Sequence, residues 1–183
     1  RASKETLEGR LRIGVIPTVA PYLLPQVVSR LTARYPGLDI HVRETVTPKL
    51  VQELNDGRLD TAILALPVSE SGLAETPLFE ENFVLVRPGS EANLPVPCAD
   101  SLKEMRLLLL EEGHCFRDQA LSFCDIQTGR PREVLDASSL STLVQMVNAG
   151  MGVTFIPEMA VPVETRSADV AVSRFEPPEP ART

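Results

Sequence analysis

Apolar and polar residues in the first part of the chain follow the periods of strands and helices in turn. The apolar runs Leu11–Ile16 and Leu59–Leu66 are typical of buried strands, and Leu38–Glu44 alternates as a strand does. Between them, helical spacing connects Leu23, Val27, Val28 and Leu31, and then Leu50, Val51 and Leu54. Strands and helices that alternate over short connections predict a mainly parallel sheet, whose ligands bind at the carboxyl ends of its strands.

A second round of the same pattern follows. Predicted strands lie at Phe83–Val86, Arg106–Leu110, Val134–Ala137 and Gly152–Ile156. Phe116–Cys124 predicts a short helix, and a longer one begins after Ser138 or Ser139 and carries Leu140, Leu143, Val144 and Val147 on one face. The pattern predicts an α/β protein with two Rossmann-like lobes, residues 10–82 and 83–174. The proline-rich stretch 175–183 leaves no room for another element.

Composition narrows the class of protein. Hydrophobic residues make up 43% and charged residues 23%, as in folded globular proteins, while aromatic residues are only 4%. No apolar run approaches the roughly 20 residues of a membrane helix, and the first residues lack the apolar stretch of a signal peptide. Three unevenly placed cysteines do not make a framework of paired bridges. These features favour a cytoplasmic protein without membrane contact.

The net charge and the spacing of possible metal ligands argue against two further kinds of site, a DNA-binding surface and a metal site. The net charge of −7 argues against direct contact with a phosphate backbone, so any DNA contact would need another segment. The chain has two histidines and neither the C-x-x-C nor the H-x-x-x-H spacing of metal sites. We expect neither a metal nor a cofactor.

Cys115 follows the predicted strand Arg106–Leu110 and precedes a helix. Backbone N–H groups at a helix start favour an anion, and Arg117 adds a positive charge, so the reactive thiolate is favoured there. Cys124 lies nine positions on, about 13–14 Å along a continuous helix and on its opposite face. A disulfide needs Cα atoms within roughly 7 Å, so joining the two thiols would require the helix to unwind or shift. The simpler interpretation is that Cys115 and Cys124 are only small buried residues of the core.

The segment Gly113–Gln119 (Gly-His-Cys-Phe-Arg-Asp-Gln), together with Phe123-Cys124, resembles the peroxide-sensing motif of the OxyR group of LysR-type transcription regulators. The resemblance extends to Ile13–Pro25, Leu59–Leu66 and Met146–Pro157 and covers nearly the whole chain. Met146–Pro157 is shared by LysR-type domains generally, whereas the segment with two cysteines is specific to the peroxide sensors. The resemblance implies the type II periplasmic-binding-protein fold of LysR substrate-binding domains.

The resemblance also implies roles for individual residues. Cys115 would be the peroxide-reactive (peroxidatic) cysteine and Cys124 the resolving one, joined by an intramolecular disulfide. The implied peroxide pocket consists of Thr18, Thr47, Gly113, His114 and Arg117, and the implied switch segment contains Phe116 and Asp118. From the pattern alone, Thr18 is an ordinary turn residue and Thr47 a helix N-cap with Pro48 in the first helical position.

The implied partners lie partly outside this sequence. The resemblance predicts hydrogen peroxide as the signal, DNA bound by a helix-turn-helix that precedes residue 1, RNA polymerase as a partner of the full-length protein, and homodimers or homotetramers. Residues 1–9 would end a linker, and 175–183 would cross back toward the first lobe, which is truncated by comparison with the family.

The leading hypothesis is a sensing domain that is not an enzyme, and two alternatives to it remain. A thiol peroxidase would use similar chemistry, but Leu110–His114 lacks the Pro and Thr that precede the reactive cysteine of peroxiredoxins. A LysR-type domain that binds a small organic effector between its lobes would leave both cysteines incidental.

Overall fold

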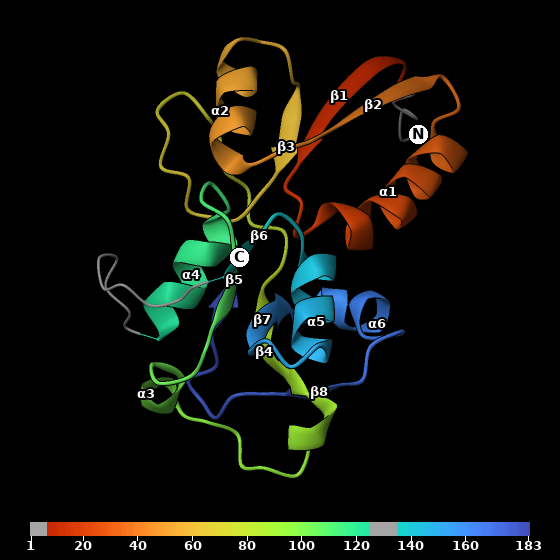
Figure 1. Cartoon of the computed structure of the whole chain (residues 1–183). Coiled ribbons are helices and arrows are strands. Elements are labelled where there is room, and N and C mark those ends of the chain that lie inside the picture. Colours follow the sequence, from red (N-terminus) through yellow and green to blue (C-terminus); the bar gives the residue numbers. More distant parts are fainter. Residues whose placement is uncertain (1–6, 125–134) are drawn as a thin grey trace. The chain divides into compact units, whose positions relative to one another are not determined.

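The structure, a computed structural model, describes residues 7–124 and 135–183 (Figure 1). They form two compact units: the first runs to Leu64 and includes Ser69–Leu73, and the second contains Ala65–Val68 and the chain from Ala74 onward. Residues 74–82, predicted in the first lobe, therefore belong with the second unit. Residues 1–6 of the predicted linker end and Val134 of a predicted strand lie outside the described residues.

The first unit is a parallel sheet in the order β2-β1-β3. Its elements are β1 (Gly9–Val15), α1 (Ala20–Arg34), β2 (Leu38–Glu44), α2 (Thr47–Asn55) and β3 (Thr61–Ile63). The two helices lie on opposite faces of the sheet (Figure 1), as successive right-handed crossovers to opposite sides of β1 require. The predicted order of strands and helices is confirmed, although β3 is shorter than the apolar run that predicted it.

Gly14 explains how closely α2 packs on β1. A Cβ atom at this position would lie 2.6 Å from Leu50 Cδ2 and 2.7 Å from Leu59 Cδ1. Leu50, on α2, is completely buried there. The start of α2 differs from the prediction by one residue, because Val46 is the N-cap and Thr47 is the first helical residue.

The sheet of the second unit is built around β4 (Glu81–Pro88). β4 pairs antiparallel with three strands, β7 (Thr154–Pro157), β8 (Val170–Ser173) and β9 (Ala181–Arg182). A separate parallel pair is formed by β5 (Leu108–Leu110) and β6 (Leu135–Ala137). The prediction of a mainly parallel sheet is wrong for this unit, because an apolar run identifies a strand without giving its direction.

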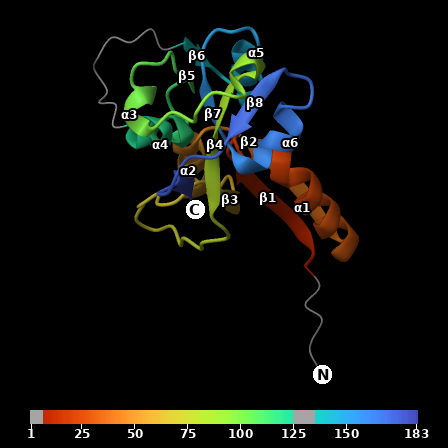
Figure 2. The ribbon, with the colours of Figure 1, turned by 90° about the horizontal axis from the view of Figure 1, so that it is seen from below.

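The helices of the second unit are α3 (Ala99–Leu102), α4 (Cys115–Phe123), α5 (Leu140–Asn148) and α6 (Val161–Glu164), with 3₁₀ turns η1 (Gly89–Glu91) and η2 (Glu158–Ala160). α4 lies beside β5 (Figure 2). All four predicted apolar residues of α5 are buried, which confirms its face. Ser139 caps it, because its Oγ accepts the Thr142 N–H at 3.2 Å. Within the described residues, no helix has the length and apolar character needed to cross a membrane.

Candidate functional site

Cys115 occupies the position that the strand and helix pattern predicted. β5 ends at Leu110, and a turn with Gly113 at φ +95°, in the left-handed region that favours glycine, leads to α4. His114 is the N-cap residue and Cys115 the first helical residue. The half-buried Cys115 therefore lies near the carboxyl end of a strand and in the first turn of a helix, where the Arg117 N–H donates to the His114 carbonyl at 3.0 Å.

His114 is buried beside this thiol, with only 6% of its surface exposed. Burial lowers the pKa of its imidazole, and the charge of Glu111 opposes that effect only in part. The ring is therefore predominantly neutral at neutral pH. A neutral imidazole can donate one hydrogen bond and accept another, and it carries no positive charge.

Arg117 ties the first turn of α4 to the strand ends. Its Nη1 donates to the Leu110 carbonyl at 2.8 Å and to Asp136 Oδ1 at 2.6 Å. Leu110 ends β5 and Asp136 lies in β6, so one side chain connects the helix to both strands. The sequence suggested that the guanidinium favours a thiolate at Cys115; in the structure its charge is paired with Asp136.

Phe116 holds the first turn of α4 in place through its buried ring. It is buried, and its ring centroid lies 4.6 Å from that of Phe83. The guanidinium carbon of Arg182 lies 5.5 Å from the centroid of Phe116. Arg182 in turn pairs with Glu81 through contacts of 2.5 and 2.8 Å, and both of these side chains are buried.

Cys124 lies directly after α4 and is completely buried. All three cysteines are thiols, so the structure represents the reduced form. Because α4 is continuous from Cys115 to Phe123, the two thiols lie on opposite faces and are separated by about 13–14 Å along the axis. They cannot form a disulfide in this conformation.

Two further side chains of α4 differ in their surroundings. Asp118 is exposed. Gln119, which sequence reasoning did not single out, has a buried Oε1 without a hydrogen-bond partner among the residues that the structure describes. Gln119 follows Cys115 by four positions and so lies on the same helix face, a spacing that could have identified it. A buried acceptor of this kind suits a small hydroxyl donor.

Thr18 and Thr47 lie in the first unit, at the carboxyl edge of its sheet. Thr18 follows β1 and is buried, while Thr47 follows β2 and is half-buried. The two strand ends are neighbours, since the Thr45 N–H donates to the Val15 carbonyl at 3.3 Å. The location agrees with the topology predicted from the sequence, and the role of the two hydroxyls stays a prediction.

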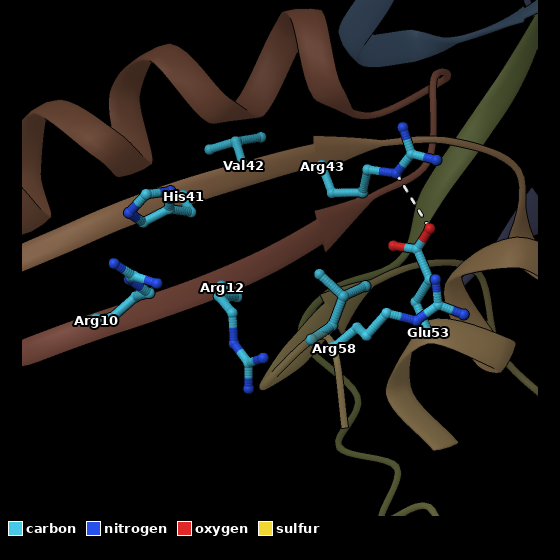
Figure 3. A pocket seen from close by; sticks show the side chains of 8 residues that line it. Arg10, Arg12, His41, Val42, Arg43, Glu53 and Arg58 are labelled. Carbon is cyan, nitrogen blue, oxygen red and sulfur yellow. Dashed lines mark hydrogen bonds and ion pairs between the residues drawn. The ribbon is translucent and has the colours of Figure 1, made fainter. Parts of the chain in front are cut away.

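A separate pocket of about 240 Å³ also belongs to the first unit (Figure 3). Its lining is rich in arginine, with Arg10, Arg12, Arg43 and Arg58 beside His41. Carboxylates compensate them, with Arg43 3.2 Å from Glu53 and Arg12 2.7 Å from Asp60. Hydrogen bonds from Arg12 lower the pKa of Asp60 to about 2. This network contains neither of the thiols that carry the predicted chemistry.

In the parts of the chain that the structure describes, no three His, Cys, Asp or Glu side chains gather as a metal ion would require.

Comparison with known proteins decides the family. The model of the LysR substrate binding domain matches residues 4–183. The chain belongs to the LysR substrate-binding domain family. Among solved members, the reduced OxyR regulatory domain of Pseudomonas aeruginosa is 34% identical with a TM-score of 0.85, covering 97% of this chain and 87% of that one. This LysR substrate-binding domain therefore has the OxyR-type fold that the sequence predicted.

Other relatives of the domain carry names that concern peroxide. A mutant OxyR of Corynebacterium glutamicum, described as H2O2-bound, is 36% identical with a TM-score of 0.87, covering 99% of this chain and 59% of that one. A "probable hydrogen peroxide-inducible genes activator" of Streptomyces viridosporus is 48% identical over 181 residues, 95% of this chain and 57% of its own length. The "DNA-binding transcriptional dual regulator OxyR" of Escherichia coli is 42% identical, over 98% and 59%. The chain thus spans less than two thirds of these curated relatives.

Proposed function

We propose that this chain is the hydrogen peroxide-sensing regulatory domain of a LysR-type transcription regulator. Peroxide oxidises Cys115, Cys115 forms a disulfide with Cys124, and the resulting change in the second unit alters DNA binding and transcription activation. The observation that carries the proposal is the placement of two thiols at opposite ends of one short helix. Cys115 is half-buried in the turn that contains His114 and Arg117, and Cys124 is completely buried.

The proposed oxidation of Cys115 and its reaction with Cys124 are two successive steps. The Cys115 thiolate attacks one peroxide oxygen, the S–O bond forms as the O–O bond breaks, and the leaving hydroxide takes a proton and departs as water, giving a sulfenic acid. The thiol of Cys124 then displaces the sulfenic hydroxyl as a second water, forming the S–S bond. Sulfur supplies the two electrons that reduce the peroxide.

The polar groups at the start of α4 suit the first step. The neutral His114 imidazole and the buried Gln119 Oε1 can exchange hydrogen bonds with a small hydroxyl compound. In this proposal the hydroxyls of Thr18 and Thr47 take part in binding peroxide, while Gly113 and Arg117 shape the turn. Phe116 and Asp118 move with the switch segment.

The second step links the chemistry to conformation. The thiols must approach from about 13–14 Å along the helix, so α4 has to open or shift before the bond can close. The cross-link then contributes about 2–4 kcal/mol to the state in which it forms. A contribution of this size is enough to shift a two-state equilibrium.

The remaining partners of the proposal lie in the longer protein. Its relatives are described as activators and a DNA-binding regulator, which supports a regulator and not an enzyme. We propose that a helix-turn-helix preceding this domain contacts DNA, since a domain of net charge −7 is repelled by phosphates. The full-length protein would act in the cytoplasm as a homodimer or homotetramer and engage RNA polymerase.

One equivalent of hydrogen peroxide, followed by alkylation of remaining thiols and peptide mass mapping, tests this function. We expect a Cys115–Cys124 disulfide with Cys98 still alkylated. In Cys124→Ser, Cys115 should instead be trapped as a sulfenic acid by a selective reagent, whereas Cys98→Ser should still form the disulfide. Oxidation confined to Cys98 would contradict the sensor. Rapid multiple turnover with a thiol reductant would favour the peroxidase instead.

A further inference from the structure

Both ends of α4 are held by one short stretch near the end of the described chain. We propose that this stretch, residues 175–182, clamps α4 in its dithiol form and so sets the equilibrium between dithiol and disulfide. The inference rests on the proposed function and adds to it the residues that determine how readily the switch closes. We call residues 175–182 the clamp segment.

At the Cys124 end, the clamp segment contributes Phe175. Its ring centroid lies 4.8 Å from that of Phe123 and 5.3 Å from that of Phe155, and the Phe123 and Phe155 centroids are 6.2 Å apart. Phe175 is buried. Because Phe123 immediately precedes Cys124, the backbone of Cys124 cannot leave its buried position without disturbing this three-ring cluster.

At the Cys115 end, the clamp segment contributes Arg182. Its guanidinium lies over the ring of Phe116, the residue that follows Cys115, and Phe83 packs against that ring as well. Glu81 fixes the guanidinium through two contacts from a single carboxylate oxygen. A buried pair with additional hydrogen bonds resists the loss of either partner, since the other charge would be left uncompensated.

The clamp segment is itself fastened to the central strand of its unit. β9 pairs with β4 through Glu81 with Arg182 and Asn82 with Ala181. Next to this ladder, the Phe83 N–H donates to the Pro180 carbonyl at 2.8 Å, and Asn82 Nδ2 donates to Glu179 at 3.3 Å. The two anchors of α4 are therefore part of the sheet of the second unit and do not move freely with the helix.

This arrangement has a thermodynamic consequence. Disulfide closure must bring together two thiols that a continuous α4 holds apart, so at least one anchored end has to leave its partners. The contacts of the clamp segment are complete only in the dithiol form. Weakening them should favour the disulfide without changing the reaction of Cys115 with peroxide.

The test equilibrates the chain with mixtures of reduced and oxidised glutathione, in which two glutathione thiols form as the protein disulfide closes. The fraction of Cys115–Cys124 disulfide is read by alkylation and mass spectrometry. We expect Phe175→Leu to raise the equilibrium constant for disulfide formation about three- to tenfold, the value of one aromatic pair. Glu81→Gln, which loosens the other end, should shift it in the same direction.

Leu143→Ala is the matched control, because Leu143 is buried in α5 and lies outside the clamp segment. It should leave the equilibrium constant unchanged although it lowers stability, which is measured for each variant by urea unfolding. In a Cys124→Ser background, Phe175→Leu should not alter the rate of sulfenic acid formation at Cys115. If Phe175→Leu does not fold, Glu81→Gln decides the outcome.

Failure of the clamp and failure of the proposed function give different results. If the parent chain forms no Cys115–Cys124 disulfide with peroxide, the proposed function falls and the clamp with it. If the parent disulfide forms but neither Phe175→Leu nor Glu81→Gln shifts the glutathione equilibrium, or if Leu143→Ala shifts it equally, the clamp alone is overturned.

Discussion

His114 is the buried titratable side chain that precedes Cys115. Burial lowers its pKa from the ordinary 6.5, so in the folded protein the imidazole stays neutral over a range in which the unfolded chain already binds a proton. The contribution of such a side chain to stability falls across the pH range in which only the unfolded state is protonated, and it is lowest below that range. The same burial keeps a positive charge away from the proposed peroxide pocket at neutral pH.

A pH dependence of stability follows at this residue. The free energy of unfolding should fall as the pH drops below about 6.5, because the unfolded chain binds a proton at His114 first. The contribution of His114 should become constant once the pH is below its lowered pKa in the folded state. Urea unfolding between pH 8 and pH 5 measures the slope. His114→Gln should flatten it. A slope that is unchanged in His114→Gln would show that His114 is not responsible.

The side chains around Cys115 also show where residue-level prediction ends. The sequence identified Cys115, His114 and Arg117 as neighbours because they are adjacent in one turn. It could not identify Asp136 or Arg182 as partners, since these contacts depend on which strands pair. Gln119 was missed for a different reason: a helix pattern gives its face but not whether its oxygen finds a donor.

At the scale of elements, α5 begins with a side-chain cap that the sequence left open between two serines. Ser139 Oγ accepts the backbone N–H of Thr142, whereas Ser138 is exposed. We expect Ser139→Ala to lower the free energy of unfolding by about 1 kcal/mol, because a backbone donor of the first turn loses its acceptor. Urea unfolding measures the change. Ser138→Ala is the control and should differ from the parent by less than half as much; equal effects would mean that Ser139 is not the cap.

The elements of the two units were predictable to different degrees. Alternation and helical spacing placed β1, α1 and β2 within a few residues, because each repeats apolar residues at the period of its element and has a clear end such as Pro36-Gly37. β8 and β9 were missed, since Val170–Ser173 is short and Ala181–Arg182 follows several prolines. The two residues of β9 are a strand only because β4 offers an edge, which is a property of the tertiary structure.

At the scale of the whole molecule, the two units contribute differently to the proposed switch. Both thiols, α4 and the clamp segment belong to the second unit, whereas Thr18 and Thr47 belong to the first. The proposed covalent change on oxidation would therefore take place within one unit. Backbone hydrogen bonds in the parallel sheet of the first unit should keep their protection when the disulfide forms.

Hydrogen–deuterium exchange of the dithiol and peroxide-treated forms, read by mass spectrometry, tests the central claim most directly, because the same peptides report the disulfide and the protection of α4. We predict that peptides covering Cys115–Phe123 exchange faster once Cys115 and Cys124 are joined, while peptides covering Gly9–Val15 are unchanged. A Cys115–Cys124 disulfide that leaves the protection of α4 intact would contradict the claim that the helix must open for the switch to close.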